Sequence, residues 1–123
     1  MNALIAERQT EGWQPPESEL EVALLAVLDR LPSKPRIVRQ AALPWRSPVP
    51  GRVDTFLPDY RLILEADGRR WHARVADFDR DRWRDNEAVA HGLRVQRLTW
   101  VHLHDMAADV IDLLERTFVS LAA

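Results

Sequence analysis

The chain of 123 residues contains no cysteine. This absence excludes disulfide bonds, thiolate zinc sites and a cysteine nucleophile, and it says nothing firm about the compartment. No apolar run approaches the roughly 20 residues that a membrane-spanning helix needs. The first residues also lack the basic segment and apolar core of a signal peptide. The sequence therefore predicts an intracellular, cytoplasmic protein without membrane attachment.

Lysine is almost absent, and the basic residues are concentrated in one part of the chain. Only Lys34 among the 17 basic residues is a lysine. The net charge is −2, but residues 36–97 carry +4, whereas residues 1–35 and 98–123 carry −3 each. Arginine suits bidentate contacts with phosphate, and codon composition is an equally good reason for arginine richness. The basic middle of the chain is therefore compatible with a polyanionic partner such as DNA.

The length and composition predict one folded domain. With 46% hydrophobic and 29% charged residues, the chain has enough apolar material for a core of its own. Residues 11–16, EGWQPP, have the composition of turns and linkers. We therefore predict a lead-in or linker over residues 1–16, with an upstream domain before it as one interpretation, and a domain over residues 17–123.

Apolar periodicity predicts the order helix, three strands, helix, strand, helix. The predicted helices are 18–31, 77–92 and 104–122, and the predicted strands are 37–45, 52–57, 61–67 and 93–101. Short connections favour antiparallel pairing of the first strands, and a helical crossover adds the last strand. These elements predict an α/β (α+β) fold with a mixed central sheet of about four strands flanked by helices.

Two of the helices carry more specific expectations. Ser18 and Glu21 fit a capping box, S-x-x-E, ahead of an apolar run. Glu21 has a second interpretation, in which its carboxylate projects toward the acids of the hairpin described next. In the highly charged helix 77–92, the residues expected to face inward are Phe78, Trp83, Ala88 and Val89.

Three carboxylates, Asp54, Glu65 and Asp67, lie on a predicted hairpin between Gly51 and His72. Glu65 and Asp67 are two residues apart on a strand and should point to the same side. Asp54 must come across from the paired strand, where opposite residues lie about 5 Å apart. Carboxylates are costly to bury unless they are paired or bound to a metal, and such hard oxygen ligands suit Mg²⁺ or Mn²⁺. The hairpin therefore predicts a divalent-metal site.

Each of these residues also has a structural interpretation. Asp54 can cap a turn, Asp67 begins a common Asp-Gly turn pair, and His72 can be a packed histidine bonded to the backbone. The functional interpretation is strongest for Glu65, because this charge directly follows residues 61–64, which are mostly apolar and typical of a strand.

Three pieces of the sequence, taken in order, resemble a known nuclease superfamily. They are the pair Val53-Asp54, the run LEADGRRWH from Leu64 to His72, and the run DRWRDNEAVAHGLRVQRLTW from Asp81 to Trp100. They resemble the PD-(D/E)XK superfamily and, within it, the branch similar to very-short-patch-repair (Vsr) endonucleases. The resemblance covers residues 17–103. It implies a restriction-endonuclease-like fold and a DNA endonuclease that depends on Mg²⁺ or Mn²⁺.

The resemblance also implies roles for individual residues. Asp54 and Glu65 take the positions of the two metal-binding acids, and Glu21 resembles the first-helix glutamate that such nucleases often add. His72 resembles the Vsr-type histidine after the second strand, and it could act as a general acid or base. Asp67 stands where the superfamily has a lysine that orients or activates water. This departure leaves the general acid or base role unassigned.

Arginines around the hairpin predict contacts with phosphate. Arg69 and Arg70 follow the second hairpin strand directly, and Arg84 is the first choice because it lies on the helix after the site. The basic residues are few, so firm DNA binding is expected to need a homodimer partner or an attached upstream domain.

Two functions from different classes follow from these observations. The first is a metal-dependent nuclease that hydrolyses phosphodiester bonds in DNA. The second is a catalytically silent nuclease-like fold that acts as a DNA-binding or protein-interaction module, which Asp67 at the lysine position favours. Cleavage of RNA is a third and weaker interpretation, since no RNA-binding motif supports it.

Overall fold

A single mixed sheet organises the computed structural model, which describes residues 13–39 and 43–122. The strands lie side by side in the order β1 (Val38–Arg39), β2 (Arg52–Leu57), β3 (Leu62–Asp67) and β4 (Arg94–Thr99). The first three strands pair antiparallel, and β4 runs parallel to β3. The predicted fold class, a mixed four-stranded sheet flanked by helices, is confirmed.

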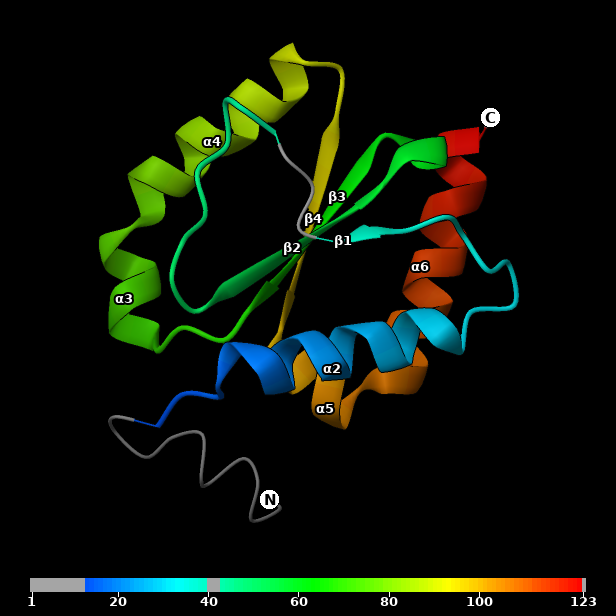
Figure 1. Ribbon diagram of the computed structural model, residues 1–123, viewed down its shortest axis with the longest axis horizontal. Coiled ribbons are helices and arrows are strands. Elements are labelled where there is room, and N and C mark those ends of the chain that lie inside the picture. The colour runs from blue at the N-terminus through cyan, green and yellow to red at the C-terminus, as the bar shows by residue number, and fades with distance from the viewer. Residues whose placement is uncertain (1–12, 40–42, 123) are drawn as a thin grey trace.

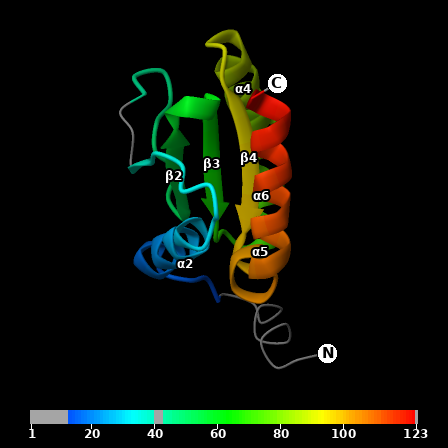
Figure 2. The same ribbon diagram turned by 90° about the vertical axis from the view of Figure 1, so that its right-hand side faces the viewer.

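Helices cover both faces of this sheet, which gives three layers (Figure 1 and Figure 2). On one face lie α2 (Glu17–Asp29), α5 (Trp100–Asp105) and α6 (Ala107–Ala122). On the other face, α3 (Trp71–Ala76) and α4 (Phe78–Ala90) form the crossover from β3 to the parallel strand β4. None of the helices in the described ranges is long and apolar enough to cross a membrane.

The main hydrophobic core lies between the sheet and the layer of α2, α5 and α6. Fully buried members from these helices and from the facing side of the strands are Leu20, Leu24, Leu28, Leu57, Leu64 and Leu114. A smaller apolar cluster on the opposite face joins Ile63 and Ala88 to Leu93, with Leu43 and Trp45 packed against it. The rest of that second face is charged, and it holds the candidate site.

The N-terminal part of the domain differs from its prediction in how α2 begins. The helix begins at Glu17 and Pro16 occupies its N-cap position without a side-chain hydrogen bond, so the predicted capping box of Ser18 and Glu21 is wrong. Pro16 has no side-chain acceptor and pre-sets a backbone angle suited to a helix start, so Ser18 falls inside the first turn. Of the predicted lead-in, residues 1–12 lie outside the described residues, and Trp13 packs against Trp100 with ring centroids 6.1 Å apart.

Within its described residues, the predicted strand 37–45 is extended sheet at two positions and leaves the sheet before residue 43. Of residues 37–39 and 43–45, Val38 and Arg39 pair with β2, and residues 40–42 lie outside the described residues. The segment 43–51, hereafter the strap, has no helix or strand and begins with a turn in which the Arg46 amide donates to the Leu43 carbonyl at 2.8 Å. The strap runs alongside α4 before the chain enters β2 (Figure 1).

The C-terminal elements also have different boundaries. The predicted strand 93–101 ends at Thr99, because the Thr99 hydroxyl accepts from the His102 amide at 3.3 Å and begins α5. His102 Nδ1 in turn accepts from the Thr99 amide at 3.0 Å, which completes a capping box. The predicted helix 104–122 is divided at Met106 into α5 and α6.

The orientation of α4 is the largest correction to the expected packing. Phe78, Trp83 and Val89 were predicted to face inward, but they are 58%, 67% and 68% exposed, and only Ala88 of that set is buried. The side chains that α4 turns toward the sheet are instead Asp81, Arg84, Asp85 and Ala88. This spacing, i, i+3, i+4, i+7, is a helical stripe like any other. Its members are mostly charged because the sheet face beneath them is charged.

Candidate functional site

Asp54 and Glu65 lie directly opposite each other on β2 and β3, and both point to the α4 side of the sheet. The predicted approach of these two acids from paired strands is therefore confirmed. Glu65 is completely buried, whereas the side chain of Asp54 is 28% exposed. A buried carboxylate requires a compensating positive charge, and the structure provides several.

Arg46 of the strap pairs with both acids. Its Nε donates to Asp54 Oδ2 at 3.0 Å, and its Nη2 forms an ion pair with Glu65 Oε2. The Arg46 side chain is only 1% exposed. The guanidinium therefore lies between the two carboxylates that the sequence predicts as metal ligands.

Two further arginines from neighbouring strands reach Glu65. Arg97 is the residue of β4 that pairs with Glu65, and its Nε donates to Glu65 Oε1 at 2.8 Å. The Nη2 of Arg97 also donates to Asp85 of α4 at 2.8 Å. Arg52 Nη1 lies 3.6 Å from Glu65 Oε1 and donates to Asp81 Oδ1 at 2.8 Å. The strand register thus fixes which arginines surround the acid.

Asp67 belongs to the same face, but Arg69 engages both of its oxygens. Asp67 Oδ1 accepts from the Arg69 backbone amide at 2.9 Å and from Arg69 Nε at 3.0 Å, and Oδ2 accepts from Nη2 at 2.8 Å. Arg69 also donates to Asp77 and Asp81, each at 2.8 Å. These hydrogen bonds, with Asp67 as the largest cause, raise the pKa of Arg69. Asp67 therefore holds the turn after β3, as its structural interpretation predicted.

These residues form one ion-pair network, hereafter the charged network. Its acids are Asp54, Glu65, Asp67, Asp77, Asp81 and Asp85, and its arginines are Arg46, Arg52, Arg69, Arg84 and Arg97. Acids and arginines are nearly equal in number, so most of the charge in this layer is balanced within the chain.

Burial affects the two α4 residues at the centre of the charged network differently. Desolvation by itself would raise the pKa of Asp81, but hydrogen bonds from Arg69 and Arg52 outweigh it and lower that pKa. For Arg84, the attraction of Asp54 and Asp81 is too weak to outweigh desolvation. Burial, together with the like charges of Arg46 and Arg52, lowers the pKa of Arg84 to about 10. The folded state therefore disfavours the charged form of Arg84, and perturbed pKa values of this kind are common at functional positions.

Three of the predicted site residues are not brought into the charged network. Glu21 pairs with Arg39 of β1, which faces the α2 side of the sheet, opposite the side of Asp54 and Glu65. His72 is exposed on α3, which argues against its interpretation as a packed histidine. Arg70 is exposed at the N-cap of α3.

The two other predicted phosphate ligands differ in their availability. Arg69 is buried, and its guanidinium donates to Asp67, Asp77 and Asp81. Arg84 is 12% exposed, donates to the Ser47 carbonyl at 2.5 Å and lies 3.8 Å from Asp54. Arg84 is thus the one of the two that stands close to the opposed acids without a strong carboxylate partner.

Sequence reasoning missed Arg46, Arg52, Arg97 and the acids of α4. The stripe of Asp81, Arg84 and Asp85 could have been found from its helical spacing if charged residues had been accepted as inward-facing. The strand arginines follow from register, because Arg52 is two residues before Asp54 and therefore shares its side of the sheet. Arg46 carries no periodic signal, because it lies in the strap.

The carboxylates of the charged network can be compared with the ligands that a divalent cation needs. Within residues 13–39 and 43–122, no three His, Cys, Asp or Glu side chains come together in a group that could hold a metal ion. Mg²⁺, however, is commonly held by one or two carboxylates, with waters and substrate phosphates as the other ligands. Asp54 and Glu65 supply two, and Asp54 Oδ1 is buried without a hydrogen-bond partner. The opposed acids therefore supply the two carboxylates that such a site requires, with the Arg46 guanidinium paired to both of them.

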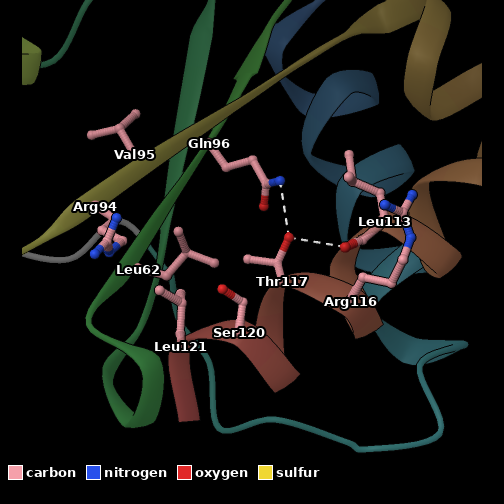
Figure 3. Close-up of a pocket in the computed structure, with 9 residues that line it drawn as sticks. All are labelled: Leu62, Arg94, Val95, Gln96, Leu113, Arg116, Thr117, Ser120 and Leu121. Atoms are coloured by element: carbon pink, nitrogen blue, oxygen red, sulfur yellow. Dashed lines mark hydrogen bonds between the residues drawn. The ribbon is translucent and has the colours of Figure 1, made fainter. Parts of the chain in front are cut away.

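A separate groove lies between β4 and α6, with a volume of about 320 Å³ (Figure 3). Gln96 donates to Thr117 Oγ1 at 3.1 Å across it, and Thr117 donates to the Leu113 carbonyl at 2.9 Å. Its lining mixes leucines with Arg94 and Arg116 and contains no acid. The groove is on the α6 side of the sheet and is therefore not part of the candidate site.

Comparison of this chain with protein-family models, with curated proteins and with solved structures gives no match. The candidate site therefore rests on the residues and contacts described above.

Proposed function

We propose that this domain is a metal-dependent nuclease of the PD-(D/E)XK, Vsr-like type, which hydrolyses phosphodiester bonds in cytoplasmic DNA. The observation that carries the proposal is the direct opposition of Asp54 and Glu65 on paired strands. Glu65 is completely buried at the centre of a sheet face, where a carboxylate is costly unless it is paired or bound to a metal.

In this proposal Asp54 and Glu65 hold Mg²⁺ or Mn²⁺. When bound, such a cation lowers the pKa of a coordinated water and polarises the phosphodiester. Asp67 does not take part directly. It fixes the turn after β3 through Arg69 and so keeps Glu65 in place. Because the lysine of the superfamily is missing at this position, His72 is assigned the proton transfer, and its exposure on α3 leaves its ring open to a substrate.

Contacts with DNA are assigned to arginines at the edge of the site. Arg84 lies 3.8 Å from Asp54 and can donate to a phosphate placed at the acids. Arg70 is exposed one residue before α3 and can contact the backbone further away. The small number of such residues supports the prediction that a second copy or an attached upstream domain contributes to binding.

The activity can be tested with supercoiled, linear duplex and single-stranded DNA in the presence of Mn²⁺. We expect cleavage of at least one form by the wild type and background levels for Glu65→Gln. Asp112→Asn is the matched control, because it removes one carboxylate from an exposed pair with Arg116 on α6. Equal cleavage by the wild type and Glu65→Gln would show that the nuclease activity does not come from this site.

The silent module remains the second candidate function because one observation favours it. Each acid of the charged network is paired with an arginine, and Arg46 contacts both predicted metal ligands. Under this alternative the arginines take the place of the cation permanently. Calorimetric titration with Mn²⁺ separates the two candidates, since a silent module has no reason to bind it at these acids.

A further inference from the structure

Arg46 has a unique place in the charged network. Among the described residues, it is the only side chain that forms ion pairs with both Asp54 and Glu65. Of the two opposed acids, Arg84 pairs with Asp54, whereas Arg52 and Arg97 pair with Glu65. Arg46 therefore occupies one oxygen of each acid, Asp54 Oδ2 and Glu65 Oε2, and its positive charge lies where a cation bridging the two acids would have to bind.

The charges around Asp54 and Glu65 oppose simultaneous binding of a divalent cation and the Arg46 guanidinium. Asp54 and Glu65 carry two negative charges, and four guanidinium groups already pair with them. A divalent cation brought among these groups would be repelled unless a positive group withdraws, because Coulomb energies at such short range are large in a buried environment.

Of the four arginines, Arg46 is the one that lies outside the helices and strands. Arg52 and Arg97 lie within strands, and Arg84 lies within α4. Arg46 lies in the strap, which is joined to α4 by the stacking of Trp45 on His91 at 4.3 Å and by the hydrogen bond from Arg84 to the Ser47 carbonyl. Withdrawal of Arg46 leaves Glu65 paired with Arg97 at 2.8 Å, so the buried acid keeps a partner.

We infer that Arg46 is an intramolecular competitor of the metal ion and sets the metal affinity of the site. This inference rests on the proposed function. In the metal-free protein the guanidinium forms an ion pair with each acid, and binding of the cation requires Arg46 to leave with its part of the strap. The apparent affinity for the cation is then reduced by the small fraction of molecules in which Arg46 has withdrawn.

The test is a calorimetric titration of the full chain with Mn²⁺, with and without a short DNA duplex. We expect Arg46→Gln to bind Mn²⁺ about tenfold more tightly or better than the wild type, since glutamine carries no positive charge that competes with the cation. We also expect Mn²⁺ to raise the Tm of Arg46→Gln more than that of the wild type. Arg36→Gln is the matched control, because Arg36 forms an exposed pair with Asp59 and its loss should leave the affinity unchanged.

A second variant keeps the test decisive if Arg46→Gln does not fold. Trp45→Leu retains an apolar side chain against the small cluster of Ile63, Ala88 and Leu93 but removes the stacking on His91. We expect Trp45→Leu to bind Mn²⁺ more tightly than the wild type, by a smaller factor than Arg46→Gln.

The outcomes distinguish this inference from the proposed function. If the wild type and both strap variants bind Mn²⁺ with equal affinity, Arg46 is not a competitor, while the nuclease proposal stands. If none of the proteins binds Mn²⁺ with or without DNA, the metal site itself is refuted, and the inference falls with it. Weaker binding by Arg46→Gln would also overturn the inference, because it would make Arg46 a support for the site.

Discussion

The two faces of the sheet differ in the side chains that cover them: one is apolar, and the other is largely charged. On the side of α2, α5 and α6, leucines from helices and strands pack into the main core. On the side of α4, a small apolar cluster occupies one part of the face and the charged network occupies the other. The first face is stabilised by the burial of apolar surface, which is not directional and does not depend on one particular partner residue. The second depends on specific pairs, so the loss of one member leaves another charge buried and unpaired.

The largest effect on the charged face is expected for Glu65→Ala. This change leaves Arg46, Arg52 and Arg97 without their shared acid, and we expect a loss of about 3–5 kcal/mol in the free energy of unfolding. Leu114→Ala on the apolar face should cost a similar amount, about 2–5 kcal/mol, through the cavity it creates. Urea unfolding measures both.

A second substitution tests whether the losses in Glu65→Ala and Leu114→Ala have different causes. Adding Arg46→Met to Glu65→Ala removes one of the stranded charges, so part of the lost stability should return. If the double variant is no more stable than Glu65→Ala alone, the buried arginine is not the cause of the loss. The two faces would then respond alike.

An intermediate effect is expected at Asp81, where it depends on pH. The pKa of Asp81 lies below its ordinary value of 3.8 because of Arg69 and Arg52. Its contribution to stability is therefore complete above pH 3.8 and is lost as the pH falls further, through the pKa of the folded state. Asp81→Asn should lose about 2 kcal/mol at neutral pH and show a flatter stability curve at acidic pH. Unfolding in urea across this acidic range gives the answer, and parallel curves for both proteins would contradict the assignment.

The smallest effect, and the only gain, is expected for Arg84→Met. Burial and the neighbouring arginines lower the pKa of Arg84 to about 10, so its charge weakens the fold. We expect the methionine variant to be more stable by about 1 kcal/mol, since one pKa unit corresponds to about 1.4 kcal/mol and the lost bond to Ser47 offsets part of the gain. The same variant should bind DNA less well. A lower Tm would refute the electrostatic account.

The sequence predicted the apolar face well and the charged face poorly. The leucine stripe of α2 and the pairing of β2 with β3 follow from periods of 3.6 and 2, which apolar residues reveal directly. The same rule placed Phe78, Trp83 and Val89 on the inside of α4, because it assumes that apolar residues face the core. In α4 the charged residues face the sheet instead, because the sheet face beneath them is charged. The spacing of apolar residues along the helix does not reveal this.

The candidate site was predictable in part for the same reason. The opposition of Asp54 and Glu65 follows from strand alternation, and the turn role of Asp67 follows from the Asp-Gly pair that it begins. The role of Arg46 could not be read from the sequence, because the strap has no period and its contact with both acids arises from tertiary packing alone. The resemblance implied a role for Glu21 in the site, whereas the packing of α2 pairs it with Arg39.

The near balance of acids and arginines in the charged network has a consequence for how the protein is made. A site whose acids were neutralised only by a cation would fold incompletely until that cation arrived, as happens in small domains whose folding requires zinc. Here the arginines come from the same chain and are present as soon as synthesis is complete. The domain can therefore reach its folded state in metal-poor surroundings.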